Sequence, residues 1–312
     1  MIKVENLSKK YDRAIAVNDI SFEIKKGEIV GFLGPNGAGK TTTLRMLTGY
    51  LKPTSGYVEM FGMNIDLNPL AFRTHIGYLP ELNPLYEEME VLEYLEYFGH
   101  LRKITKDILR KRIKTVVDSC GLGDVVGRDV GQLSKGFKQR LGLALAILHD
   151  PDILLLDEPT SGLDPNQIRE IRSLIQELRK EKTVVLSTHI LQEVQASCSR
   201  VLIINRGKIA ASGTTDELRD MVMGKEMIRL QLKGVNQDVS ASLKEIEGVG
   251  SARQIGHEEG IGTEYEIESN VEYDIREKIF TRAVEQKWII LEMHRQAANL
   301  EEIFRRLTQD GS

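Results

Sequence analysis

The chain of 312 residues is longer than one ordinary hydrophobic core requires, which favours two domains. Hydrophobic residues make up 41% of the sequence and charged residues 28%, a balance that excludes collagen-like and disordered chains. The 42 basic and 46 acidic residues leave a formal net charge of −4, so we do not expect the chain to hold nucleic acid by bulk charge.

Strands and turns are predicted in the first part of the chain. Apolar and charged residues alternate at 2–5 and again at 20–25, which is typical of half-buried strands. The segment 28–33, apolar after Glu28, predicts a buried strand, and it leads into a glycine-rich loop at 34–40. A helix should follow over 41–49. The sequence therefore predicts a strand, a glycine loop and a helix in that order.

Apolar residues at helical spacing dominate residues 87–149 and predict three helices. The residues that mark them are Leu92, Leu95 and Phe98 in the first, Ile108, Ile113, Val116 and Val117 in the second, and Leu141, Leu145 and Leu148 in the third. Asp164 and Pro165 then have the order of a helix cap followed by a first-turn proline. Three short apolar segments predict further strands, at 153–156, 183–186 and 201–204. Short apolar strands separated by amphipathic helices predict an α/β fold whose mainly parallel sheet is covered on both faces.

The pattern changes after residue 220, and we predict a small α+β domain over 221–312. The expected strands lie around 228–232, 265–267 and 288–291, the second after a turn at Gly260 and Gly262, and the expected helices around 239–246 and 275–283. If 250–255 is also a strand, the order is βαββαβ, that of a ferredoxin-like domain. A last helix should begin at Asn299 with Glu302 as its capping partner, and it should carry Leu300, Ile303, Phe304 and Leu307.

Neither a membrane span nor a signal peptide is expected from this sequence. The longest run without a polar side chain is the eight residues 141–148, whereas a helix crosses a bilayer with about 20. Residues 1–5 alternate apolar and charged side chains, unlike a signal peptide. Cys120 and Cys198 form no CxxC motif, as expected of reduced thiols. We therefore expect a cytoplasmic protein.

Residues 34–41 match the GxxxxGKT pattern of a phosphate-binding loop. Its glycines let backbone N–H groups approach phosphates, Lys40 supplies a cation, and the Thr41 hydroxyl is a ligand for Mg²⁺. The helix that follows adds the partial positive charge of its N-terminus. An ordinary glycine-rich turn is the alternative, but the position between a strand and a helix favours phosphate binding.

A carboxylate pair follows the apolar strand at 153–156. Asp157 emerges at the carboxyl end of that strand, where a ligand for the Mg²⁺ of a nucleotide is needed. Glu158 comes next and is our candidate general base for the water that attacks the γ-phosphate. A buried strand that ends in a solvated acidic turn is the alternative for this motif alone.

Together with these motifs, three further segments make residues 1 to about 220 resemble the ATP-binding cassette (ABC) family. Residues 133–140, Leu-Ser-Lys-Gly-Phe-Lys-Gln-Arg, are similar to the family's signature sequence. Residues 161–164 are similar to its D-loop, and residues 187–189 are similar to the segment that carries its switch histidine. The family fold comprises a RecA-like core, an antiparallel β subdomain and a helical subdomain, which we place at about 87–149.

The resemblance implies that two copies pair head to tail and enclose two ATP molecules between them. The implied ATP contacts are Tyr11, Asn36, Gly37, Ala38, Gly39, Lys40, Thr41, Thr42, Glu81, Ser134 and Gly136. Thr41, Glu81 and Asp157 would hold Mg²⁺, and Glu158, His189 and Asp164 would take part in catalysis. A lone histidine such as His189 would otherwise more often be a hydrogen-bonded core residue. A separate transmembrane permease is the implied partner. Through that partner, this chain would lie at the inner face of the cell membrane.

Two departures from the family pattern point to one of its branches. Glu81 stands where the family usually has glutamine, so a metal-ligating oxygen is kept while an amide donor is lost. Lys135 and Phe137 replace common residues of the signature, while Ser134 and Gly136 remain. Both departures resemble the ABC-2-type exporter branch, and residues 78–86 resemble its gliding-motility-associated subunits. The prediction is an ATPase subunit of an exporter.

Two other classes of protein, non-transport ABC ATPases and small-molecule P-loop kinases, are the alternatives to this prediction. Non-transport ABC ATPases act on DNA or ribosomes, but they generally have two fused cassettes, long coiled-coil insertions or zinc cysteines, which this sequence lacks. A small-molecule P-loop kinase would need no signature sequence. The C-terminal domain is either a stabilising appendage that pairs with its copy or a ligand sensor. The helical segment begins with a glutamate-rich stretch from Glu87, and this stretch is more typical of a solvated face than of a docking site.

Overall fold

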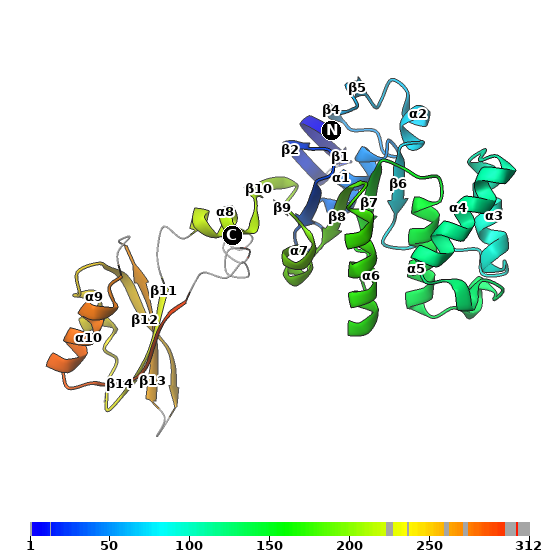
Figure 1. Cartoon of the computed structure of the whole chain (residues 1–312). Helices are drawn as coiled ribbons and strands as arrows, with labels where there is room; N and C mark the ends of the chain where they lie inside the picture. Colours follow the sequence, from blue (N-terminus) through cyan, green and yellow to red (C-terminus); the bar gives the residue numbers. More distant parts are fainter. Residues whose placement is uncertain are drawn as a thin grey trace. The chain divides into compact units, whose positions relative to one another are not determined.

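The computed structural model describes residues 2–12, 14–222, 227–235, 237–258, 262–270, 274–296 and 304. The chain divides into two compact units, residues 1–214 and 215–312, and Figure 1 shows the elements of each. Of the predicted last helix, Asn299, Leu300, Glu302, Ile303 and Leu307 lie outside the described residues, as does Gly260 of the predicted turn.

A six-stranded sheet forms the frame of the first unit, with the strand order β10-β9-β3-β8-β7-β6. Its strands are β3 (Ile29–Leu33), β6 (Ile76–Leu79), β7 (Ile153–Asp157), β8 (Thr183–Thr188), β9 (Arg200–Asn205) and β10 (Lys208–Gly213). All neighbours pair in parallel except β9 and β10. The strands predicted from apolar runs are therefore confirmed as members of one mainly parallel sheet.

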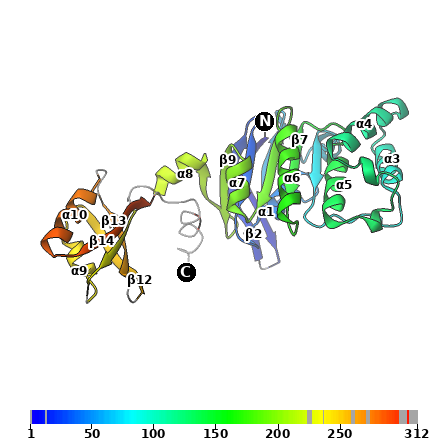
Figure 2. The same ribbon diagram turned by 60° about the horizontal axis from the view of Figure 1, so that its bottom comes forward.

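Both faces of this sheet are covered, because its strands are apolar on both sides. Ile153 and Leu155 of β7 pack with α1 (Lys40–Leu47) and with an antiparallel sheet, whereas Leu154 and Leu156 pack with α6 (Pro165–Leu178). The antiparallel sheet has the order β2-β1-β4-β5 and consists of β1 (Ile2–Tyr11), β2 (Ala14–Ile24), β4 (Ser55–Met60) and β5 (Met63–Asn64). Figure 2 shows α6 and α7 (Leu191–Ser197) on one side of the main sheet.

Three helices gather at one end of the unit, beside β6 (Figures 1 and 2). They are α3 (Val91–Leu101), α4 (Lys106–Ser119) and α5 (Lys135–Ile147), with the short helices η1 (Gly123–Val125) and η2 (Val130–Gln132) between the last two. Of the apolar residues that mark these helices in the sequence, Leu95, Ile113 and Leu141 are buried, whereas Leu92 is 39% and Ile108 55% exposed. The residues beside these two, Val91 in α3 and Leu109 in α4, are buried with the rest of each apolar face. A short helix, α2 (Pro69–Arg73), was not predicted.

The second unit is an antiparallel sheet with helices packed on it. It contains α8 (Thr215–Val222), β11 (Met227–Lys233), α9 (Ser240–Lys244), β12 (Val249–Glu258), β13 (Gly262–Ser269), α10 (Arg276–Glu285) and β14 (Ile289–Gln296). The sheet order is β12-β13-β11-β14. Alternate residues of β11, such as Leu230, join Leu243 of α9 and Ile279 of α10 in one core. Segment 250–255, uncertain from sequence, lies within strand β12.

Within the described residues, no helix combines the length and the apolar character that crossing a membrane requires.

Candidate active site

The carboxyl ends of four parallel strands bring the predicted site residues to one edge of the main sheet. The glycine-rich loop follows β3, Asp157 ends β7, and His189 comes directly after β8. Glu81 follows β6 after Pro80. Parallel strands end at the same edge of a sheet, so segments that are far apart in sequence meet there.

The glycine-rich loop and its surroundings enclose a cavity of about 330 Å³. Its lining combines the loop with three residues from elsewhere in the chain: Ala16, Asn36, Gly37, Ala38, Gly39, Lys40, Thr41, Thr42, Glu81 and Glu158. Gly39 has a φ of +108°, and a Cβ there would lie 2.5 Å from the carbonyl oxygen of Ala16. Only glycine allows this close approach, and the loop that results begins α1 directly at Lys40.

The Lys40 ammonium is buried within the loop that precedes it. Its Nζ donates to the carbonyl oxygens of Gly34 at 2.8 Å and Pro35 at 3.3 Å. It also lies 3.3 Å from Oε1 of Glu158, and both side chains are less than a tenth exposed. A buried cation needs such partners because desolvation is costly. The sequence motif located Lys40 in the loop, but its ion pair with Glu158 was not predicted.

The Asp157 carboxylate is almost fully buried and only half satisfied. Its Oδ1 accepts hydrogen bonds from Thr41 Oγ1 at 3.0 Å and Ser187 Oγ at 2.5 Å. Its Oδ2 is buried and has no hydrogen-bond partner among the described residues. Buried polar atoms of this kind are rare, and an anionic oxygen beside a hydroxyl suits a hard divalent cation or a water bound to it. The donor set at this point therefore fits Mg²⁺.

Glu158 is held at both its backbone and its carboxylate. Its backbone N–H donates to the carbonyl oxygen and to the hydroxyl of Ser187, both at 3.1 Å. Its Oε2 lies 2.9 Å from Nδ1 of His189, opposite the contact of Oε1 with Lys40. The φ of Glu158 is +47°, which is unusual for a residue other than glycine and marks a strained turn. The contacts of Ser187 with the backbone of Glu158 were not predicted from the sequence. A hydroxyl residue near the end of an apolar strand was the one sign that Ser187 could belong to the site.

The signature and D-loop residues have structural roles within this chain and do not line the cavity described above. Ser134 caps α5 by accepting a hydrogen bond from the backbone N–H of Phe137 at 3.4 Å. A Cβ on Gly136 would lie 2.6 Å from the side chain of Gln167, so α5 and α6 approach closely there. Asp164 caps α6 in a complete capping box with Gln167.

Tyr11 also lies apart from the cavity lining, with 44% of its surface exposed and Nζ of Lys9 5.3 Å from its ring centre. The structure thus unites the glycine-rich loop, Glu81, Asp157, Glu158 and His189. It leaves Tyr11, Ser134, Gly136 and Asp164 outside this group.

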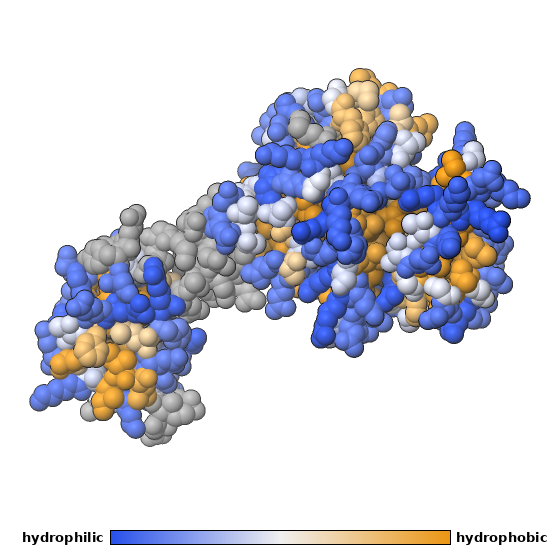
Figure 3. Space-filling model, in the orientation of Figure 1, coloured by the Kyte–Doolittle hydropathy of each residue, from blue (hydrophilic) through white to orange (hydrophobic). Residues whose placement is uncertain are grey.

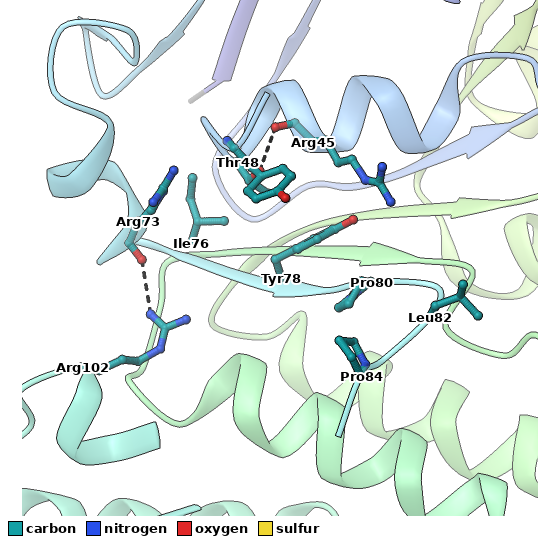
Figure 4. Close-up of a pocket in the computed structure, with 10 residues that line it drawn as sticks. Arg45, Thr48, Arg73, Ile76, Tyr78, Pro80, Leu82, Pro84 and Arg102 are labelled. Carbon is teal, nitrogen blue, oxygen red and sulfur yellow. Dashed lines mark hydrogen bonds between the residues drawn. The ribbon is translucent and has the colours of Figure 1, made fainter. Parts of the chain in front are cut away.

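A second cleft, of about 620 Å³, opens beside β6 (Figure 4). Its lining is rich in arginine and in apolar residues: Arg45, Thr48, Tyr50, Arg73, Ile76, Tyr78, Pro80, Leu82, Pro84 and Arg102. No carboxylate of the described residues forms an ion pair with any of the three arginines. Burial and the nearby charge of Asp157 raise the pKa of Tyr78 to about 12, so this phenol stays neutral. The cleft is positively charged and adjoins Glu81 along the chain.

Comparison with known proteins supports the resemblance of the first unit to the ATP-binding cassette family. Residues 17–161 match the model of the family described as "ABC transporter". The chain is 40% identical to the ABC transporter ATP-binding protein NatA of Bacillus subtilis, over 68% of this chain and 87% of that protein. It is 30% identical to the linearmycin resistance ATP-binding protein LnrL of the same species, over 99% of this chain and 98% of that protein.

Solved structures of ABC cassettes share the fold. The structure of an ATP-binding subunit of an ABC transporter superposes with a TM-score of 0.65 at 30% sequence identity, and the match covers 71% of this chain and 92% of that chain. A dimeric bacterial ABC transporter cassette has a TM-score of 0.63 at 28% identity and covers 69% of this chain and 98% of that chain. The first unit therefore has the P-loop ABC ATPase fold. The chain belongs to the ABC transporter ATP-binding protein family, and it is an ATPase that binds and hydrolyses ATP for transport.

Proposed function

We propose that this chain is the nucleotide-binding subunit of an ABC-2-type exporter and that ATP-driven pairing of two copies powers export through a separate permease. Glu81 and the segment 78–86 resemble that branch. Relatives with export-like names support it, including the bacitracin transport ATP-binding protein BcrA of Bacillus licheniformis, 40% identical over 77% of each chain. A probable multidrug ATP-binding protein of Escherichia coli, YbhF, is 39% identical over 70% of this chain.

One observation carries the proposed pairing: the site in a single chain is incomplete. The cavity contains the phosphate loop, Glu81 and Glu158, whereas Ser134 and Gly136 lie outside it. In our proposal, each copy offers the capped N-terminus of α5 to the ATP held by the other. A helix N-terminus with a serine hydroxyl and a glycine amide is suited to a γ-phosphate. The triphosphate then bridges the two copies, and its cleavage lets them separate.

The remaining residues take the following roles in our proposal. Tyr11 stacks on the adenine, the amides of 36–42 bind the phosphates, and Lys40 neutralises them. Thr41, Asp157 and Glu81 hold Mg²⁺, which when bound stabilises charge on the phosphate oxygens. The unpartnered Oδ2 of Asp157 and the position of Glu81 in the cavity lining support this set.

Glu158 accepts the proton of the water whose oxygen attacks the γ-phosphorus, while the bond to the β-phosphate oxygen breaks and ADP leaves. Its carboxylate lies between Lys40 and His189, which supports a fixed orientation toward the γ-phosphate. His189 orients Glu158 through Nδ1 and contacts the γ-phosphate with its other ring nitrogen. Asp164 positions the D-loop at the interface between the two copies, at the start of α6.

We propose the arginine-rich cleft as the docking site of the permease. Its three arginines without carboxylate partners among the described residues favour a partner segment that carries an acidic side chain. Leu82 on its wall is 85% exposed, and further apolar residues are exposed over β5 and α2 (Figure 3): Met63, Leu67 and Leu70. Glu81 next to Leu82 lines the nucleotide cavity, so partner and nucleotide act on the same loop. The subunit is then cytoplasmic and peripheral at the inner face of the membrane.

The domain limits that we propose are 1–220 for the ATP-binding domain, with its helical subdomain at about 87–149, and 221–312 for a ferredoxin-like accessory domain. The βαββαβ order and the sheet order β12-β13-β11-β14 support that description of the second domain. We assign it the role of a stabilising appendage that pairs with its copy in the dimer.

Co-purification from a detergent extract tests the transport role. A tagged full-length chain should retain a multi-span membrane protein, and an acidic substitution at Arg45, Arg45→Glu, should release it. Retention of ribosomes or DNA instead would identify a non-transport ABC ATPase. Calorimetry with Lys40→Ala tests the phosphate loop: ATP binding should be lost, and unchanged affinity would contradict the assignment.

A further inference from the structure

A buried glutamate on α7 binds two loops of the active-site edge. Glu193 is 3% exposed, and both of its carboxylate oxygens accept hydrogen bonds from threonine hydroxyls. Thr160 donates to Oε1, and Thr188 donates to Oε2 at 2.6 Å. Glu193 is not among the residues that line the nucleotide cavity, so its influence on the site passes through other residues.

The two threonines flank the residues proposed to orient the attacking water. Thr188 directly precedes His189, and its hydroxyl also accepts a hydrogen bond from the backbone N–H of Ile190 at 3.0 Å. One hydroxyl therefore binds Glu193 and shapes the turn that presents the histidine. Thr160 lies two residues after Glu158, and its carbonyl oxygen accepts from the N–H of Leu163 in the D-loop at 3.2 Å.

The carboxylate of Glu193 also faces α6, the helix that follows the D-loop. Arg172 of α6 places Nη2 3.9 Å from Oε1 of Glu193, and α6 is the helix that Asp164 caps. Residues 161–164 thus connect two points, Thr160 and α6, that both face Glu193. Gln139 of α5 binds the residue before Thr160, because its Nε2 donates to the carbonyl oxygen of Pro159 at 2.9 Å.

Anchoring of α7 does not by itself account for this network. Val194 packs closely on Gly31 of β3, where a Cβ would meet its side chain at 3.1 Å, and Leu191 is also buried. These contacts attach the helix to the sheet without Glu193. A buried carboxylate is costly unless its partners are well placed, and here two of those partners belong to segments of the active-site edge.

We propose that Glu193 is a positioning residue that locks the segment after Glu158 to the turn carrying His189, and so maintains the 2.9 Å contact between these two side chains. The same lock couples the D-loop to the histidine turn. This inference rests on the roles proposed above for Glu158 and His189. A small displacement of a catalytic pair lowers the rate of the chemical step more than it lowers substrate affinity.

Steady-state ATP hydrolysis by the full chain tests the lock, using Glu193→Ala, Thr188→Val and Thr160→Val. We expect kcat to fall by about 10- to 100-fold while the KM for ATP changes by less than about threefold, since a misplacement near 1 Å costs about that much in rate. Thr183→Val is the matched control, because Thr183 on the same strand is buried and hydrogen-bonded to Gly27 but lies at the opposite end. Its kcat should equal that of the wild type.

A double-mutant cycle separates positioning from mere stability. In a His189→Ala background, Thr188→Val should lower kcat by less than about twofold, because the group that it positions is already absent. Full additivity of the two effects would overturn the proposal, as would wild-type kcat in the single variants. Circular dichroism melting identifies variants that do not fold, and if Glu193→Ala is one of them, the two threonine variants decide. Wild-type turnover in Glu158→Gln and His189→Ala would contradict the proposed function itself, whereas their loss beside unaffected Glu193 and threonine variants would contradict only the lock.

Discussion

Replacing Glu158 by glutamine should stop turnover while the rest of the site stays in place. Glutamine has nearly the same shape, and the backbone contacts of residue 158 with Ser187 do not involve its side chain. The amide cannot accept a proton from water, and loss of a general base costs about 10²- to 10⁴-fold in rate. This corresponds to about 3–5 kcal/mol added to the activation barrier, at 1.36 kcal/mol for each factor of ten.

ATP binding should survive this substitution and become tighter. The negative charge of Glu158 lies 3.3 Å from Nζ of Lys40, and it competes with a phosphate for the same cation. Removing the charge takes away the one carboxylate that pairs with this ammonium among the described residues, so a triphosphate meets less competition there. If two copies enclose ATP, the uncleaved nucleotide should then hold them together, and a stable dimer should accumulate.

The assay combines phosphate release with light scattering after size exclusion, both in Mg-ATP. Glu277→Gln is the control, since Glu277 is exposed on α10 of the second unit and should change neither quantity. A kcat within about threefold of the wild type would refute the assignment of the base, because it falls short of the range for general-base loss. A variant that binds ATP without turnover but stays monomeric at every concentration would refute the proposed pairing.

Three further predictions concern the metal ligand, the phosphate loop and a buried histidine. Asp157→Asn should raise the Mg²⁺ concentration that gives half-maximal ATPase activity and lower kcat by at least about 10²-fold, because it removes a hard charged ligand; a magnesium titration measures both. Gly39→Ala should lower the unfolding midpoint and abolish ATP binding, because φ at this position is +108°, and strain of this kind costs about 1–3 kcal/mol; unchanged melting and binding would contradict the loop geometry. Burial, with the charge of Arg102, lowers the pKa of His149 to about 4, and its Nε2 lies 3.1 Å from the carbonyl oxygen of Ile76. The folded state therefore binds the proton less readily than the unfolded state, so this histidine should cost about 2 kcal/mol of unfolding free energy as pH falls from about 7 to about 5. Urea denaturation at several pH values should show that loss of unfolding free energy in the wild type and a smaller loss in His149→Gln. An equal change of unfolding free energy with pH in the two proteins would contradict the prediction.

Local patterns in the sequence were sufficient for the main elements of the sheet. Apolar runs at 28–33, 153–156, 183–186 and 201–204 correspond to β3, β7, β8 and β9, because a buried parallel strand must be apolar on both faces. Asp164 and Pro165 likewise begin α6 as predicted, since a cap and a first-turn proline act through their own neighbours. Features that depend on a few adjacent residues can therefore be predicted without the tertiary structure.

The apolar faces of the helices were predicted, but not which residues at the edge of each face are buried. Leu92 and Ile108 fit an apolar stripe in sequence, yet both are exposed, because the neighbouring Val91 and Leu109 also fit one and face the core. A stripe that is three residues wide allows more than one rotation of the helix. The surface against which the helix packs decides among these rotations, and in α3 and α4 that surface is built from other helices of the same subdomain.

The sequence alone determined which chemical groups this protein has and the order in which it has them: a glycine loop with Lys40, a carboxylate pair after a strand, a capped signature helix and a histidine turn. Only the tertiary structure decided which of these groups touch. It placed Glu158 between Lys40 and His189, left one oxygen of Asp157 without a partner among the described residues, and bound Glu193 to two loops. The reason is physical: a motif reflects backbone geometry over a few residues, whereas all of these contacts except that of Glu193 with Thr188 join segments about 30 to 120 positions apart, which meet because parallel strands end at a common edge.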